Sequence, residues 1–170
     1  MPSSPGQRHC PNSKGTSTQM LNTQTVAEAL DLLEVTYSTT EDDSWFMVDW
    51  TTGTCSFRTH LIVEDGGAFL NMRTDGLPAA PAGGSRRTAL LEELNRLNFR
   101  FRVAKCMINP MDGAITVTSE QWYADCEVTP NAVAGTLSSM LSIIEELLLA
   151  VDSLCNDVND DGIDESIERN

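Results

Sequence analysis

The sequence predicts an α+β fold, in which helices pack on an antiparallel sheet of about five strands in the chain order α-β-β-β-α-β-β-α. Three observations lead to this prediction. Residues 54–64 alternate between apolar and polar side chains, as expected of a half-buried strand. The dipeptides Asp65-Gly66 and Asp112-Gly113 predict tight turns, which join antiparallel neighbours. The long apolar stretch at 130–154 has helical spacing and predicts a helix buried along one side.

In the first half of the chain we expect one helix followed by three strands. The Thr25–Glu28 segment has the capping-box pattern that opens a helix, and we expect this helix to end near Val35–Tyr37. The helical face would be formed by Val26, Leu30, Leu33 and Tyr37. The strands are predicted at 44–51, 54–64 and 68–73.

In the second half, a Pro/Gly-rich loop at 75–85 separates the three strands from a second helix at 86–98. We expect a fourth strand at 99–108, with Phe99 and Phe101 on one face and Arg100 and Arg102 on the other, and a fifth strand at 114–123. Thr129-Pro130 is a cap with proline at the first helical position, so the last helix is predicted at 130–154.

Composition indicates one domain between two polar ends. The chain has 170 residues, 41% of them apolar, which suffices for one packed core. Residues 1–22 are rich in Ser, Pro, Thr and Gln, so we expect them to be disordered. Residues 152–170 carry seven acidic residues and one arginine. We therefore expect a folded domain at 23–155 and an acidic tail at 156–170.

The net charge of −14 disfavours nucleic acid and anionic membrane surfaces as partners. The chain has no run of about 18 apolar residues and its first 20 residues lack the apolar segment of an export signal, so we expect a cytoplasmic protein that does not span a membrane. The five cysteines include no C-x-x-C pair and are expected to be reduced thiols.

A family resemblance is carried by the run Leu90–Met107, a leucine-rich helix that passes directly into alternating aromatic and basic residues. Its most specific part is Glu93-Leu94-Asn95-Arg96 followed by Phe99-x-Phe101. With the following Asp-Gly turn and the long helix that starts at Thr-Pro, this resembles the YbjN-like family of bacterial sensory transduction regulators over residues 24–154. The resemblance implies a fold similar to type III secretion chaperones, a protein-binding or chaperone-like role, often as a homodimer, and no catalytic motif.

The strand predicted at 44–51 is apolar on both faces, with Phe46 and Trp50 on one side and Trp45 and Met47 on the other. Either the chain itself covers both faces, or one face is covered by a second subunit or a client protein. We favour the interface, since a sheet packed by helices on one face leaves the other exposed. Asn95 and Arg96 lie near the end of the second helix, where a structural role is the first interpretation; a role in an interface is the second.

The acidic tail contains a calcium-loop pattern, D-x-N-x-D-G followed by five residues and Glu168. The expected ligands are Asp157, Asn159, Asp161, the carbonyl of Ile163, and Glu168. A tail so rich in Asp and Asn also matches this pattern by chance, so a solvated acidic extension is the alternative.

No arrangement of residues indicates catalysis. His60 lies mid-strand without a nucleophile in a defined neighbouring register, and no phosphate loop, dinucleotide fingerprint or zinc-protease motif is present. The sequence therefore predicts a non-catalytic protein-binding module without a cofactor, with weak calcium binding as the alternative function.

Overall fold

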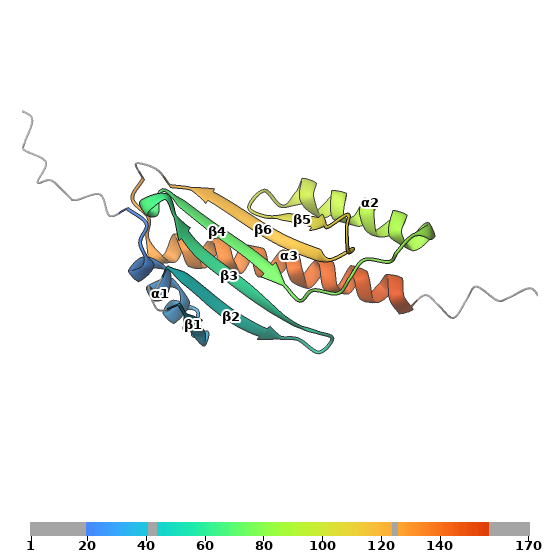
Figure 1. The fold of residues 1–170 in the computed structure, drawn as a ribbon, viewed down its shortest axis with the longest axis horizontal. Coiled ribbons are helices and arrows are strands. Elements are labelled where there is room, and N and C mark those ends of the chain that lie inside the picture. The colour runs from blue at the N-terminus through green and yellow to red at the C-terminus, as the bar shows by residue number, and fades with distance from the viewer. Residues whose placement is uncertain (1–19, 41–43, 124–125, 157–170) are drawn as a thin grey trace, which may run out of the picture.

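The computed structural model describes residues 20–40, 44–123 and 126–156. These residues form three helices, six strands and one short 3-10 turn (Figure 1). In chain order the elements are α1 (Thr23–Leu32), β1 (Tyr37–Thr39), β2 (Trp45–Thr51), β3 (Ser56–Glu64), η1 (Asp65–Gly67), β4 (Phe69–Asp75), α2 (Gly84–Arg100), β5 (Lys105–Ile108), β6 (Ile115–Trp122) and α3 (Pro130–Asn156).

The strands form one antiparallel sheet in the order β1-β2-β3-β4-β6-β5. This confirms the predicted α+β class, with one strand more than the sequence indicated. The extra strand, β1, has only three residues and pairs Tyr37 with Val48 and Thr39 with Phe46 at the edge of β2. Three residues are too few to show a period of two, so the sequence alone gives no signal for it.

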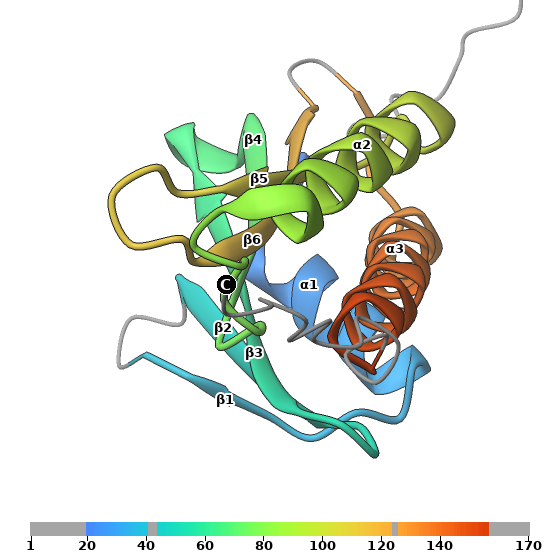
Figure 2. The ribbon, with the colours of Figure 1, turned by 90° about the vertical axis from the view of Figure 1, so that its right-hand side faces the viewer.

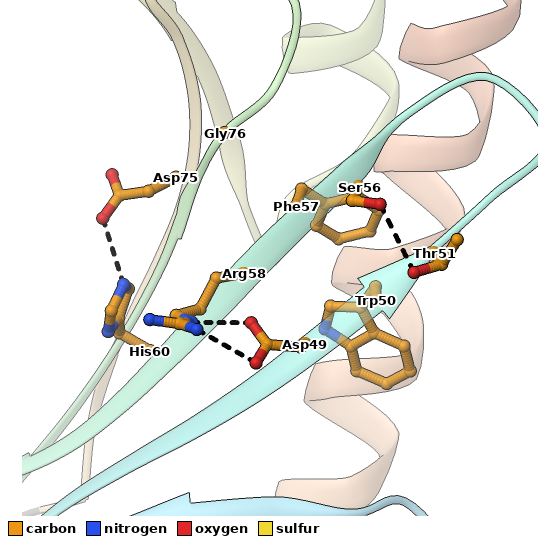
Figure 3. Close-up of a pocket in the computed structure, with 9 residues that line it drawn as sticks. All are labelled: Asp49, Trp50, Thr51, Ser56, Phe57, Arg58, His60, Asp75 and Gly76. Carbon is orange, nitrogen blue, oxygen red and sulfur yellow. Dashed lines mark hydrogen bonds and ion pairs between the residues drawn. The ribbon is translucent and has the colours of Figure 1, made fainter.

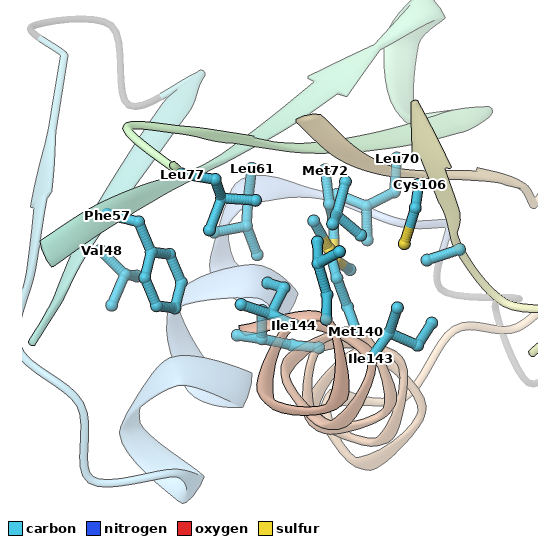
Figure 4. Close-up of a cluster of buried hydrophobic side chains, with 14 of the residues drawn as sticks. Val48, Phe57, Leu61, Leu70, Met72, Leu77, Cys106, Met140, Ile143 and Ile144 are labelled. Atoms are coloured by element: carbon cyan, nitrogen blue, oxygen red, sulfur yellow. The ribbon is translucent and has the colours of Figure 1, made fainter. Parts of the chain in front are cut away.

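The three helices lie on the same face of the sheet (Figure 2). Helix α3 runs beneath the strands and contacts both α1 and α2. Alternate residues of the strands point into this layer, for example Phe46, Leu61 and Met72, which are directly opposite one another in register and at most 2% exposed. Leu61 and Met72 point toward Met140, Ile143 and Ile144 of α3 (Figure 4), and all belong to one buried cluster.

Among the described residues, α3 is the helix long and apolar enough to cross a membrane by length and composition, with a mean hydropathy of 1.5. Its apolar side chains are the main partner of the sheet, however. Val133, Leu137, Met140 and Ile144 are all at most 1% exposed. Core packing in this fold therefore accounts for the apolar composition of α3.

Helix α1 begins and ends earlier than the capping-box pattern predicted. Asn22 is the N-cap: its side-chain oxygen accepts a hydrogen bond from the backbone N–H of Thr25 at 2.9 Å. The helix ends at Leu32, and Glu34 then takes a left-handed backbone conformation with φ of 55°. The chain thus leaves the helix in time for Tyr37 to enter β1. Leu21 is already 2% exposed, so the packed core starts there.

The predicted strand at 99–108 is wrong in its first half. Helix α2 continues to Arg100, and only Lys105–Ile108 forms β5. Phe99 is 90% exposed, whereas Ala104, which the same alternation would place beside Arg100 and Arg102, is buried. The Arg100 guanidinium donates to Glu146 of α3 at 2.7 Å, a contact that requires Arg100 to project from the last turn of α2. The packing of Leu97, which is fully buried, and the bonds from Asn98 to Cys106 hold the end of α2 as helix, where the local alternation of Phe and Arg favoured strand; the exposed ion pair of Arg100 adds little.

Candidate functional site

The sheet face opposite the helices carries the candidate site, and no described element covers it (Figure 2). We call it the open face. Because side chains alternate along each strand, Trp45 and Met47 point to it while their neighbours Phe46 and Val48 are buried beneath the helices. The strand registers add Arg58, His60, Ile62, Phe69, Asn71, Arg73, Asp75, Thr118, Glu120 and Trp122, among others.

The large apolar side chains of the open face lie in one half, where Glu64, Asn71 and Glu120 are their polar neighbours in register. Trp45, Ile62, Phe69 and Trp122 form a diagonal band across the adjacent strands β2, β3, β4 and β6, which we call the apolar band. Ile62 is opposite Trp45 in register, and Phe69 is opposite Trp122, with ring centroids 6.0 Å apart. Trp45 is 39% exposed and Trp122 is 65% exposed. Large aromatic groups left uncovered on one face of a sheet are typical of a contact surface.

The other half of the open face is charged and surrounds a shallow hollow of about 600 Å³ (Figure 3). The Arg58 guanidinium donates to both carboxylate oxygens of Asp49, at 2.6 and 3.0 Å. This hydrogen bonding lowers the pKa of Asp49 and raises that of Arg58. Asp75 lies 3.1 Å from His60 Nε2 and 3.4 Å from Arg73 Nε. The opposite charges in this half therefore pair with one another.

His60 and Trp45 join the two halves. The indole Nε1–H of Trp45 donates to His60 Nδ1 at 3.0 Å, and the two rings meet edge to face at 5.4 Å. Because an indole nitrogen can only donate, Nδ1 must be the unprotonated nitrogen, and Nε2 carries the hydrogen that faces Asp75. The arrangement fixes neutral His60 in one tautomer and holds Trp45 in place.

The open face does not bring a nucleophile to His60. Ser56, the hydroxyl in the same strand and hollow, is four residues away, a separation of about 13 Å along an extended strand. Its hydroxyl instead lies 3.3 Å from that of Thr51. Within residues 20–40, 44–123 and 126–156, no three His, Cys, Asp or Glu side chains come together as a metal site. The residues predicted to bind calcium, 157–168, lie outside the described part of the chain.

The six predicted interface residues occupy three different environments, and their role in an interface stays a prediction. Trp45 and Met47 lie on the open face. Phe46 is 2% exposed in the core, and Trp50 is half-buried on the helix side, where its indole donates to Thr59 at 3.0 Å.

Asn95 and Arg96 lie on the exposed side of α2. Arg96 donates to Glu93 at 2.8 Å and lies 3.6 Å from Glu146, so it helps to tie α2 to α3. Hydrogen bonding to Arg96 lowers the pKa of Glu93. The junction between helix and strand is closed by Asn98, in place of Asn95. The Asn98 side chain donates to the carbonyl of Cys106 at 2.9 Å and accepts from its N–H at 2.7 Å.

Phe69 and Trp122 of the apolar band were missed as site residues. The usable signal was the alternation that places Leu70 and Met72 in the core, since it puts Phe69 on the opposite face.

The model of the YbjN family, described as "Putative bacterial sensory transduction regulator", matches residues 22–153. The chain belongs to the YbjN family. No curated protein sequence matches it significantly.

Among solved structures, YbjN from E. coli superimposes with a TM-score of 0.58 at 12% identity, over 81% of this chain and 96% of that one. ExsC in the ExsC–ExsE complex superimposes with a TM-score of 0.51 at 16% identity, over 75% of this chain and 90% of that one. The HopA1–SchA chaperone–effector complex gives 0.50 at 9% identity, over 74% and 91%. These likenesses show the fold, which is that of type III secretion chaperones.

Proposed function

We propose that this YbjN-family protein is a non-catalytic binding module of the chaperone or adaptor kind, which holds a client protein on the open face of its sheet. The observation that carries the proposal is the uncovered apolar band, since all three helices pack on the other face. Trp122 alone is 65% exposed. Aromatic side chains of this kind contribute much of the binding energy when a partner excludes water from them.

The charged half of the open face is a poor place for a client to bind, which restricts binding to the apolar band. Its carboxylates and guanidinium groups already pair with one another, so a client that buried them would lose their hydration and gain little. The four side chains of the apolar band carry no charge and incur no such penalty, provided that Asn71 and Glu120, in register with Ile62, stay in contact with water. A client segment is therefore expected to follow the band from β2 to β6, with its polar residues beyond the edges of the band.

The fold likeness supports this role, because two of the similar solved structures are complexes, one of them a chaperone–effector complex. We further propose that the folded domain spans residues 23–155, that it acts in the bacterial cytoplasm, and that the protein forms a homodimer. Sedimentation of the full chain at high micromolar concentration tests the dimer: a single species of monomer mass would refute it.

Site-specific photocrosslinking tests the binding face. Benzoylphenylalanine replaces Trp122 in the apolar band or, as a control, Ser142, which is exposed on α3. We expect adducts with other proteins at position 122 that are absent at position 142. An adduct of twice the chain mass alone would mean that a second copy covers the band, and the client role would then fail. With a client identified, Trp122→Ser should weaken its binding about tenfold.

The calcium-binding alternative rests on Asp157, Asn159, Asp161, Ile163 and Glu168, whose spacing matches a calcium loop. Titration of the full chain with calcium, with Asp157→Asn as the control, tests it. In a calorimetric titration, a binding heat that is present in the native chain and absent in the variant would support a calcium site. The absence of any binding heat at millimolar calcium would refute calcium binding.

A further inference from the structure

A second surface, on the helix side of the molecule, lies where the tip of the β2–β3 hairpin meets the last turns of α3. A hollow of about 320 Å³ is lined there by Thr52, Thr54, Glu145, Leu148, Leu149 and Asp152. The hairpin extends past the body of the sheet toward the C-terminal part of α3 (Figure 1). The apolar band lies at the other end of the strands, so the two surfaces are separate.

The positions of four residues along α3 account for the chemistry of this hollow. Leu148 is part of the core and only 8% exposed, and it forms the floor. Glu145, Leu149 and Asp152 follow one another at intervals of four and three residues, so they share one face of the helix. Leu149 is 72% exposed, a large apolar group between two carboxylates. The hollow is thus apolar at its centre and acidic at its rim.

The charge around the hollow has one sign. None of its lining residues is basic, and the last turn of α3 contains no basic residue that would offset the negative end of the helix dipole. Neither Glu145 nor Asp152 forms an ion pair with a described residue. The net charge of −14 makes a second copy of this chain a poor occupant, because two acidic rims would repel each other.

We propose that this hollow docks a basic segment of a partner protein, which places one branched apolar side chain against Leu148 and Leu149 and flanking Lys or Arg groups beside Glu145 and Asp152. The volume suits an anchor of one or two side chains and is small for a cofactor. Charge complementarity of this kind speeds association and sets specificity, so binding is expected to weaken as salt rises.

Fluorescence anisotropy with three labelled peptides of equal length tests this on the full chain. The first has Leu flanked by lysines, the second has Ser in place of Leu, and the third has Leu flanked by glutamates. We expect the first to bind most tightly, with about tenfold weaker binding of the second peptide. The third peptide should not bind. Equal binding of the first and second, or no binding of any, would overturn the proposal.

Matched variants locate the site. Leu149→Ser and Glu145→Gln should each weaken the first peptide about five- to tenfold. Leu32→Ser is the control, because Leu32 is also an exposed leucine beside two acids, Glu28 and Asp31, in a hollow at the α1 end. Equal loss in Leu32→Ser and Leu149→Ser would show attraction to any acidic surface and overturn the proposal. Trp122→Ser should leave peptide binding unchanged, whatever becomes of the client-binding face.

Discussion

Replacing Asn98 by alanine should destabilise the fold far more than replacing its neighbour Asn95. The Asn98 side chain makes two hydrogen bonds to the backbone of Cys106, at 2.9 and 2.7 Å, on the side of β5 that faces away from β6. Both backbone groups of Cys106 therefore depend on this one amide. Since β5 is the last strand of the sheet, Asn98 occupies the position that a further strand would take.

The size of the effect follows from those two bonds. Each hydrogen bond contributes about 0.5–1.5 kcal/mol net, and a buried backbone group left unpaired costs about 1–3 kcal/mol. Cys106 is 3% exposed, so water does not readily replace the lost amide. We expect Asn98→Ala to lower the free energy of unfolding by about 2–3 kcal/mol. With a urea m-value of about 2 kcal/mol/M, the midpoint falls by about 1–1.5 M.

Urea unfolding followed by tryptophan fluorescence measures both variants in parallel. Asn95→Ala is the matched control: the same truncation on the same helix, at an exposed residue with no hydrogen bond to any part of the described structure. We expect it to change the free energy of unfolding by less than about 0.5 kcal/mol. Midpoints for the two variants within about 0.2 M of each other would refute the proposed role of Asn98.

Two other substitutions and one labelling experiment test the turn and the core. Gly67→Ala should lower the melting temperature much more than Gly66→Ala. Both glycines have positive φ, 95° and 66°, but only a Cβ at Gly67 collides with the backbone carbonyl of Leu21. Similar melting temperatures would contradict this. Burial raises the pKa of the Cys106 thiol to about 12, so at pH 8 a thiol reagent should label exposed Cys126 quickly and Cys106 only after unfolding. If the fast phase of thiol labelling were lost in Cys106→Ser, in which Cys126 is intact, the prediction that Cys106 is protected would be wrong.

The elements with a clear period could be predicted from the sequence. The alternation at 54–64 gave β3, and the heptad-like spacing after Pro130 gave α3, since both elements have one buried and one exposed side. The faces were also correct for β2, where Phe46 and Val48 are buried and Trp45 is exposed. A period records which side of an element meets the core, and that information is local.

The errors occurred where a distant contact decides the local structure. Residues 99–104 alternate in a way that suits a strand, yet the burial of Leu97 and the bonds from Asn98 to Cys106 of β5 keep the first of them helical. A distant contact also explains why Asn98, and not Asn95, binds the backbone of Cys106 at the junction between helix and strand. Both lie on α2 near its end, and only the position of β5 determines which of them can reach a strand backbone. The candidate site depends on such placement too, because Trp45 and Trp122 are far apart in the chain and meet one surface only through the order of the strands.

The open face has an apolar band at one end of its strands and paired charges at the other, and this difference determines which end a client can cover. In the charged half the cost of removing water is high, because Asp49, Arg58 and Asp75 are already paired. In the apolar band that cost is absent and burial is favourable. Trp45 stands at the boundary, where its indole nitrogen is satisfied by His60 and its ring remains available to a partner. A client can therefore cover the ring of Trp45 without leaving the indole nitrogen unpaired, whereas beyond Met47, four residues along β2 from Trp45, it would have to desolvate Asp49. The position of this boundary limits where a client can lie.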